Sequence, residues 1–248
     1  DLVSVIIPYY KKKKFILETV ESVLNQSYPN LEILLIYDDD NENDLNFVRE
    51  LQKRDNRIIV IKNKTRMGAG ISRNIGIYKS KGKYVAFLDA DDTWHPNKLN
   101  KQIKFMKNFN YFATHTSYSI ITESKLVIGK RIARNFLKLD ELLKSCDIGT
   151  STVIIKKNIF DTNIKFASLK TKEDFVLWLR LLKKNIKIYA LNEDLTKWKK
   201  SKNSLSSSTF QKFFDGYKVY KNYLYYSRFK SLYFLFILSL NFILKKFK

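Results

Sequence analysis

Three carboxylates stand together in Asp89-Ala90-Asp91-Asp92, directly after an apolar stretch at residues 84–88 that predicts a buried strand. Carboxylates this close repel one another and raise one another's pKa unless a cation or hydrogen bonds offset the charge. Oxygen ligands suit a hard ion such as Mg²⁺ or Mn²⁺, which could bridge a nucleotide diphosphate and neutralise charge on the leaving group. The alternative is a solvated acidic turn before the helix that starts near Pro96.

Two other segments carry groups that suit a nucleotide. Asp38-Asp39-Asp40 follows the predicted strand at residues 31–37, where a carboxylate could accept hydrogen bonds from a nucleobase or ribose. Aspartates are equally common in ordinary turns. Arg73 lies early in a predicted helix at residues 72–80, and its fork of donors suits a phosphate.

Glu173-Asp174 opens a strongly apolar helix predicted at residues 175–182. One interpretation makes Asp174 a general base for an acceptor hydroxyl, its carboxylate kept ionised by the helix N-terminus. The other treats Thr171-Lys172-Glu173-Asp174 as a capping box, in which Asp174 satisfies a backbone amide.

Several common chemistries have no support in the sequence. Gly68-Ala69-Gly70 follows the third strand and lacks the third glycine of a dinucleotide fingerprint, and no Gly-Lys-Ser/Thr phosphate loop occurs. His95 and His115 have no Cys or second His at ligand spacing, which argues against zinc. No Gly-x-Ser-x-Gly elbow is present, so serine hydrolase chemistry is unsupported as well.

The elements that must position these groups alternate in the first ninety residues between apolar strands and amphipathic helices, which favours a parallel sheet of βαβ units. We predict strands at residues 3–7, ended by Pro8, and at 31–37, 58–61 and 84–88. Ligands of such sheets bind beyond the carboxyl ends of the strands. The second half is less regular, with helices predicted at residues 96–109 and 175–182 and strands at 112–121 and 152–155. No Gly/Ser/Pro linker divides the halves, and a tail is expected from near Lys197.

Composition supports a folded α/β domain. The chain has 248 residues, 45% of them hydrophobic and 28% charged, which excludes disorder, and its 7 glycines and 3 prolines exclude collagen-like and linker-rich chains. The single cysteine, Cys146, cannot form an internal disulfide, so a reducing cytoplasm is the simplest compartment. The opening apolar run lacks the basic start of a secretory signal.

Positive charge is concentrated in the tail. The net charge is +22. Residues 196–248 hold twelve Lys and Arg against one acid, Asp215, so half of the net charge lies in this segment. This distribution indicates an anionic partner, although a low-GC genome that uses Lys at solvated positions would also raise the overall charge. A basic module for single-stranded nucleic acid is disfavoured, because its groove should not present two acidic runs at one sheet edge.

Residues 232–244 are almost wholly apolar and are bracketed by Arg228, Lys230 and Lys245-Lys246. A spanning helix needs about 20 such residues, so this segment is too short to cross a bilayer. Lying in the interface, with its lysines near anionic headgroups, it would form a monotopic anchor. The alternative is a terminal helix packed on the domain or in a dimer interface.

Five segments in order resemble the family 2 glycosyltransferases, which have the glycosyltransferase A fold, over residues 1–205. The matching segments are Val3-Ser4-Val5-Ile6-Ile7-Pro8-Tyr9-Tyr10, residues 21–33, Ser72-Arg73-Asn74-Ile75-Gly76, residues 82–92 and Glu173-Asp174. Residues 94–99 and 148–153 look most like bacterial surface-polysaccharide transferases of the teichuronic acid and capsule type. The resemblance implies a Rossmann-like, mostly parallel central sheet flanked by helices, followed by a basic, apolar helical tail.

The resemblance also implies a division of the chain. A catalytic domain would span residues 1–205, with a nucleotide-binding part at 1–95 and an acceptor-binding part at 96–205, and the tail would span 206–248. It further implies a role for each matching residue. The implied donor contacts come from Pro8, Tyr10, Asp38, Arg73, Asp89, Asp91 and Asp92, the metal ligands are Asp91 and Asp89, the acceptor contact is Glu173, and the catalytic base is Asp174.

By this resemblance the chain would be an inverting transferase dependent on Mn²⁺ or Mg²⁺. It would move a sugar from a UDP-sugar to a lipid-linked glycan in capsule, lipopolysaccharide or teichuronic acid synthesis, in the cytoplasm and peripheral to the inner face of the membrane. A catalytically degenerate protein that binds nucleotide without turnover is the alternative.

The sequence departs from the family pattern at three places, and two of them, at Tyr37 and Ser201, motivate that alternative. Tyr37 replaces the first of two usual aspartates, and Lys11 replaces a common asparagine. Trp198-Lys199-Lys200-Ser201 stands where many members have Tyr-Arg-x-His, which removes a histidine that can assist the metal or diphosphate. Lys197, Lys199 or Lys200 could supply positive charge instead.

Overall fold

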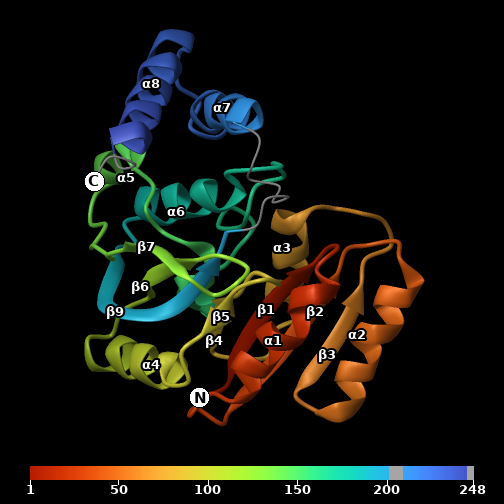
Figure 1. The fold of residues 1–248 in the computed structure, drawn as a ribbon. Helices are drawn as coiled ribbons and strands as arrows, with labels where there is room; N and C mark the ends of the chain where they lie inside the picture. Colours follow the sequence, from red (N-terminus) through yellow and green to blue (C-terminus); the bar gives the residue numbers. More distant parts are fainter. Residues whose placement is uncertain (201–208, 245–248) are drawn as a thin grey trace.

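In the computed structural model, which describes residues 1–200 and 209–244, nine strands join in one curled sheet (Figure 1). The strands follow the order β3-β2-β1-β4-β8-β6-β9-β5, and β7 pairs with β6 off this path. The strands are β1 (Val3–Tyr9), β2 (Leu31–Tyr37), β3 (Ile58–Lys62), β4 (Tyr84–Phe87), β5 (Thr93–Trp94), β6 (Ala113–Ile121), β7 (Val127–Arg131), β8 (Ile154–Lys156) and β9 (Ile188–Lys199). The helices are α1 (Lys13–Leu24), α2 (Glu42–Arg54), α3 (Ala69–Lys79), α4 (Lys98–Asn108), α5 (Leu139–Lys144), α6 (Glu173–Lys183), α7 (Thr209–Lys218) and α8 (Arg228–Leu244), with short turns η1 (Thr150–Thr152), η2 (Lys157–Ile159) and η4 (Val219–Tyr223).

The first four strands are parallel neighbours, as predicted, with β1 between β2 and β4. The expectation that Pro8 ends the first strand is wrong, because β1 continues to Tyr9 and Pro8 stays in register with Ile36. Proline lacks a backbone donor and is confined to places where the ladder does not need one. The pairing of β4 with β1 ends at Ile6, so one side of β1 has no β4 partner at Pro8.

Alternation along these strands separates two apolar cores, one on each face of the sheet. Val5 and Ile7 face a core that includes Ile16, from α1, and residues of α2 and α4. Ile6 faces the opposite core, to which Trp178 of α6 and residues of α3 contribute. Helices therefore cover both faces, as the family resemblance implied for a sheet flanked by helices.

The second half adds strands that the sequence pattern placed only in part. β8 lies between β4 and β6 and is antiparallel to both. It begins at Ile154 rather than at residue 152, because Thr152 is the last residue of the turn η1. β9 runs parallel to β6 and reaches Lys199. The tail therefore does not begin near Lys197, because that residue is paired within the sheet.

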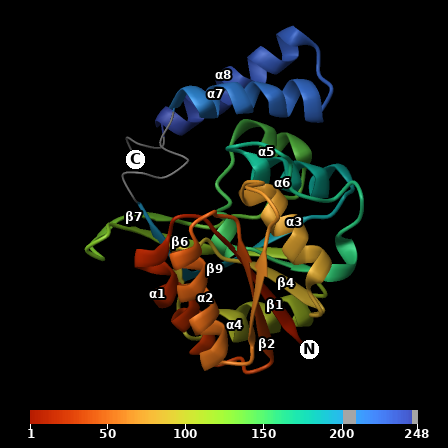
Figure 2. The same cartoon turned by 90° about the vertical axis from the view of Figure 1, so that its right-hand side faces the viewer.

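The helices of the tail pack on one end of the domain, above α5 and α6, as Figures 1 and 2 show from two sides. Leu235 and Leu238 of α8 are buried in the core shared with α6. Helix α7 passes close to α8 at Gly216, where an added Cβ would lie 2.9 Å from Leu235. The expected boundary between residues 205 and 206 lies outside the described residues. The alternative of a terminal helix packed on the domain is therefore correct for the face of α8 that carries Leu235 and Leu238.

Candidate active site

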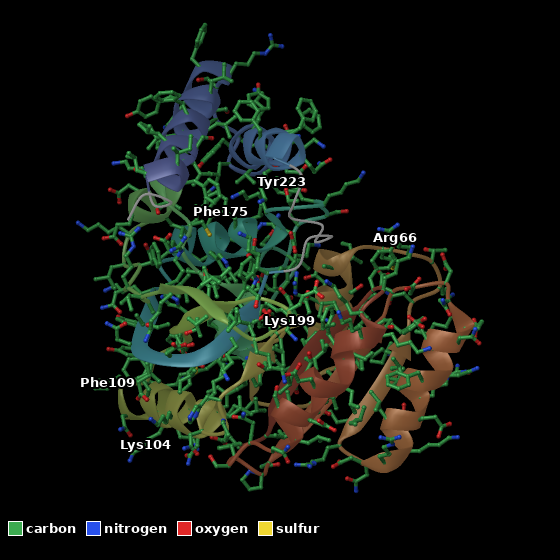
Figure 3. All side chains as sticks on the ribbon, viewed as in Figure 1. Arg66, Lys104, Phe109, Phe175, Lys199 and Tyr223 are labelled. Carbon is green, nitrogen blue, oxygen red and sulfur yellow. The ribbon has the colours of Figure 1, made fainter. Side chains whose placement is uncertain are left out.

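The carboxyl ends of β1, β2 and β4 bring the predicted donor-site residues to one edge of the sheet. Pro8 is near the end of β1, Tyr10 follows it, and Asp38 directly follows β2. The guanidinium of Arg66, from the loop between β3 and α3, lies 3.9 Å from the ring centre of Tyr10. Figure 3 labels Arg66 on this loop, beside α3.

Asp38 is buried and organises the loop between β3 and α3. Its Oδ1 accepts hydrogen bonds from Asn63 Nδ2 at 2.7 Å and from Met67 N at 2.8 Å, and its Oδ2 accepts one from Gly68 N at 2.7 Å. Gly68 has a φ of +85°, a conformation that favours glycine. The carboxylate expected to meet a nucleobase thus holds the loop that carries Arg66 over Tyr10.

Arg73 is buried between two carboxylates that come from different parts of the chain. Its Nη2 donates to Asp89 Oδ1 at 2.5 Å, and its Nη1 donates to Glu173 Oε1 at 2.8 Å. Burial alone would lower the pKa of Arg73, but Asp89 and Glu173 raise it above the ordinary value. Arg73 was expected to face the ribose or diphosphate. In the structure it instead joins the end of β4 to the start of α6.

Gly70 permits this approach of α3 to the loop before α6. A Cβ at this position would overlap the carbonyl oxygen of Ala167 and lie 3.1 Å from the Cβ of Glu173. Glycine is therefore required by space, and the segment that superficially resembles a dinucleotide fingerprint serves helix packing.

Asp91 pairs with a cation that the sequence did not suggest. Its Oδ2 lies 2.6 Å from the ammonium of Lys12, which comes from the loop between β1 and α1. Burial raises the pKa of Asp91, and Lys12 opposes this shift. The side chain of Asp91 is 14% exposed, so a ligand at the sheet edge can contact its carboxylate.

Asp92 differs from its two neighbours because it is fully buried. It accepts hydrogen bonds from Ser151 Oγ at 2.5 Å and from the backbone N–H of Lys199 at 2.8 Å. Burial raises the pKa of Asp92 well above its ordinary value, and the negative charges of the nearby Asp91 and Asp89 raise it further. The expected donor contact of Asp92 is contradicted by its burial, which makes it a link between β4, η1 and β9.

Asp174 lies in the first turn of α6 and is held by a specific donor. Its Oδ2 accepts from Thr150 Oγ1 at 2.8 Å, and its Oδ1 accepts from the N–H of Phe175 at 2.7 Å. The predicted capping box is absent, although Asp174 does satisfy a backbone amide, that of Phe175. The N-cap residue is Lys172, with a left-handed backbone and no side-chain cap, and Thr171 donates instead to Asp215 of α7.

Glu173 is largely buried beside Asp174. Burial raises its pKa to about 7, which Arg73 opposes and the neighbouring Asp174 reinforces. Glu173 and Asp174 therefore differ in their partners, since Glu173 is paired with a cation while Asp174 accepts hydrogen bonds from neutral donors.

The residues present fit a divalent cation held partly by substrate. Among the described residues, no group of three or more His, Cys, Asp or Glu is arranged to hold a metal ion. Mg²⁺ commonly takes one or two carboxylates and completes its shell with waters and substrate phosphates. Asp91 and the one-third exposed Asp89 offer such hard oxygen donors at the sheet edge.

Two residues at the departures from the family pattern, Tyr37 and Lys199, are buried in the fold. Tyr37 is buried, stacks on Tyr9 with ring centres 5.1 Å apart, and fills the core at the end of β2. Lys199, which Figure 3 labels, is also buried, with its ammonium 3.1 Å from Glu18 of α1. Lys197 and Lys200 are exposed, and Ser201 lies outside the described residues.

Sequence reasoning did not assign roles to Lys12, Thr150 and Ser151. The segment with Thr150 and Ser151 was noticed only for its family resemblance, although small hydroxyl residues there are well suited to bond nearby carboxylates. Lys12 carried no signal of its own because it is one of four consecutive lysines.

Comparisons with known proteins show that the chain is similar to one family of enzymes. The model of a family described as "Glycosyl transferase family 2" matches residues 4–161. The chain is 36% identical over 211 residues to a "Putative teichuronic acid biosynthesis glycosyltransferase TuaG" of Bacillus subtilis, covering 85% of this chain and 83% of that protein. It is 37% identical over 212 residues to the Escherichia coli protein named "UDP-Glc:alpha-D-GlcNAc-diphosphoundecaprenol beta-1,3-glucosyltransferase WfgD", covering 85% and 81%.

Solved structures with low sequence identity share the fold. A crystal structure of Staphylococcus aureus TarS residues 1–349 with UDP-GlcNAc has a TM-score of 0.75 at 19% identity, covering 95% of this chain and 70% of that one. The mannosyltransferase PcManGT of Pyrobaculum calidifontis, with GDP-Man and Mn²⁺, has a TM-score of 0.70 at 13% identity, covering 94% and 69%. The predicted fold class is confirmed.

Proposed function

The chain belongs to glycosyl transferase family 2, and on this basis we propose that it moves a sugar from a UDP-sugar to a lipid-linked glycan with inversion at the anomeric carbon. The observation that carries the proposal is the chain of ion pairs Asp89–Arg73–Glu173. It holds the strand end expected to bind the donor against the helix start that bears Asp174. Donor and base are thereby fixed relative to each other, which is what an in-line displacement requires.

The donor half of the site is formed at the ends of β1, β2 and β4. Pro8 and Tyr10 would line the nucleobase pocket, with Asp38 fixing the loop that closes it. Asp89 would contact the ribose. A bound Mn²⁺ or Mg²⁺, held by Asp91 and Asp89, would neutralise negative charge on the departing diphosphate.

Asp174 would act as the general base. Its carboxylate accepts the proton of the acceptor hydroxyl while the hydroxyl oxygen forms a bond to the anomeric carbon. The bond from that carbon to the diphosphate oxygen breaks, and the nucleoside diphosphate leaves with the electron pair. Thr150 orients the base through the 2.8 Å hydrogen bond to Oδ2, and Glu173 would help to hold the acceptor.

The acceptor class is inferred from the relatives. WfgD is named for a diphosphoundecaprenol-linked acceptor, and TuaG for teichuronic acid biosynthesis. By this similarity we assign the chain to bacterial surface-polysaccharide synthesis, acting on a lipid-linked glycan at the cytoplasmic face of the membrane.

The surface of α7 and α8 supports contact with that membrane. Large apolar side chains are exposed on both helices, led by Phe229 at 87% and Phe210 at 83%. The other exposed ones on these helices are Phe213, Phe214, Leu232, Tyr233, Phe236, Leu240, Phe242, Ile243 and Leu244, and Tyr225 is exposed just before α8. An apolar patch of this extent marks an interaction surface.

Charge favours an anionic bilayer over a second copy of the chain as the occupant. The described part of the tail carries only cationic charge at its surface, because its one acid, Asp215, is buried against Thr171. Two such faces would repel each other, whereas anionic headgroups attract them. Within the described residues, the helices are all too short or too polar to cross a bilayer, so α8 would lie in the interface.

Asp215 of α7 connects the tail helices to the segment just before α6. It accepts hydrogen bonds from the backbone N–H and the hydroxyl of Thr171, each at 3.0 Å. Thr171 precedes α6 and therefore Asp174. A tail docked on the bilayer would hold the start of α6 near lipid-linked acceptors.

Transfer is tested with purified protein, a panel of UDP-sugars and undecaprenyl-diphosphate-linked acceptors, by following release of UDP. The proposal expects UDP release that requires an acceptor and a product with inverted anomeric configuration by NMR. Retention of configuration would contradict the single-displacement mechanism.

Docking is tested by cosedimentation with phosphatidylglycerol or phosphatidylcholine vesicles. We expect binding to the anionic vesicles that is lost in a Phe229→Ser/Phe236→Ser variant. The matched control is Tyr78→Ser, which removes an 81% exposed aromatic on α3. Equal binding of the two variants would contradict the assignment to the tail.

A further inference from the structure

Four consecutive lysines, Lys11 to Lys14, form the loop between β1 and α1 and the start of α1, at the edge of the sheet where the donor site is expected. Lys13 lies 3.3 Å from Asp44, and Lys14 lies 2.8 Å from Glu123. The ammonium of Lys11 lies over the ring of Tyr10 at 5.3 Å. Lys12 reaches across the sheet edge to Asp91 of the β4 end, 79 residues away in sequence.

The backbone of Lys12 is fixed while its side chain is not enclosed. Its carbonyl accepts hydrogen bonds from the N–H groups of Phe15 and Ile16, which start α1. Its side chain is 23% exposed and ends in the contact with Asp91 Oδ2 at 2.6 Å. The ammonium can therefore change partners through side-chain rotation alone, without movement of the helix.

The other two carboxylates at this strand end have different partners. Asp89 is paired with the buried Arg73, and Asp92 is enclosed with Ser151 and the backbone of Lys199. Asp91 is thus the carboxylate whose charge is balanced by a movable cation. An ammonium and a divalent ion at the same carboxylate oxygen repel each other, so each weakens the binding of the other.

We propose that Lys12 is a built-in cation that alternates with the divalent metal at Asp91 and binds the donor diphosphate. This inference rests on the proposed function. With no metal bound, Lys12 neutralises Asp91 and attracts the diphosphate. When a metal occupies Asp91, the displaced ammonium remains within side-chain reach of the phosphates.

The proposal predicts that one substitution changes the affinities for two ligands in opposite directions. In Lys12→Met the metal no longer competes with an ammonium, so Mn²⁺ alone should bind more tightly, by roughly tenfold, the factor that one charge-assisted hydrogen bond supports. UDP in the presence of EDTA should bind more weakly by a similar factor, because a phosphate contact is lost. A folding defect would weaken both ligands, so it cannot imitate this result.

The measurements are Mn²⁺ titration followed by the EPR signal of free Mn²⁺, and calorimetric titration of UDP in EDTA. Lys14→Met is the matched control, since it removes an exposed lysine of the same run that pairs with Glu123, and both affinities should equal those of the wild type. Unchanged affinities in Lys12→Met, or weakening of both, would overturn the proposal. If the wild type binds no nucleotide with or without Mn²⁺, the proposed function fails, while the Mn²⁺ titration still tests the exchange at Asp91.

Discussion

Arg73 Nη1 lies 2.8 Å from Glu173 Oε1, a contact between residues that are 100 positions apart in the chain. Because the same guanidinium also binds Asp89, it connects the carboxyl end of β4 to the first turn of α6. Lysine has a single donor nitrogen, so it cannot reproduce two contacts that come from the two separate nitrogens of the guanidinium. The integrity of the site therefore depends on an arginine at this position.

Arg73→Lys should leave one carboxylate of this ion-pair chain without its partner. Breaking a buried ion pair is strongly destabilising, so we expect a loss of about 3 kcal/mol in the free energy of unfolding. Urea unfolding measures this loss, and Arg49→Lys on the exposed face of α2 serves as control. A variant as stable as the control would show that the bridge contributes little.

Gly70→Ala should disturb the contact between α3 and the start of α6 by steric overlap, without changing any charge. The new methyl group would overlap the carbonyl oxygen of Ala167 and crowd Glu173. Overpacking of this kind costs about 1–3 kcal/mol, and displacement of Glu173 should lower transfer as well. Gly129→Ala is the control, because its Cβ would meet its nearest atom at 3.5 Å. Thermal unfolding and UDP release measured on both variants test this expectation.

The parallel half of the fold could be predicted from sequence because each strand is a continuous apolar run between helical repeats. β2, for example, is buried along its whole length and has the predicted bounds. β9 was missed because its residues are buried irregularly along its length and its register with β6 shifts. Its position is fixed by pairing with a strand far away in sequence.

The candidate site could be located from sequence, but the contacts of its residues could not. Strand ends placed Asp38, Asp89 and Asp91 at one edge of the sheet. Which carboxylate is buried depends on the approach of η1 and β9 to Asp92, and the capping box failed because Thr171 bonds to Asp215 of a distant helix. Contacts between residues this far apart in the chain leave no local pattern in the sequence.

Asp174→Asn should remove the proposed general base while leaving the proposed donor site intact. We expect the turnover number to fall by about 10²–10⁴-fold, since an amide cannot accept the hydroxyl proton. The dissociation constant of UDP should not change. Steady-state kinetics and UDP titration test this, with Asp140→Asn as an exposed control. Retained turnover would remove Asp174 from the role, and loss of UDP binding would point to a structural defect.

His115 should make stability depend on pH. Burial lowers its pKa to about 4, while its Nε2 donates to the Arg134 carbonyl at 2.8 Å. Because the folded pKa is below that of the unfolded chain, the contribution of His115 is present above about pH 6.5 and is lost as pH falls toward 4. This contribution is at most about 3 kcal/mol.

Urea unfolding between pH 4 and 7 tests the role of His115. In His115→Asn the part of the pH dependence that comes from this residue should disappear, so the difference in unfolding free energy between wild type and variant should shrink as pH falls. A difference that is constant across this range would show that His115 titrates alike in the folded and unfolded chains.

The donor site itself is tested by calorimetric titration of UDP with and without Mn²⁺, on the wild type, Asp91→Asn and the Asp140→Asn control. We predict that Mn²⁺ strengthens UDP binding in the wild type and the control, and that this gain is lost in Asp91→Asn. Absence of UDP binding in the wild type under both conditions, or an undiminished Mn²⁺ effect in Asp91→Asn, would contradict a donor site at the end of β4.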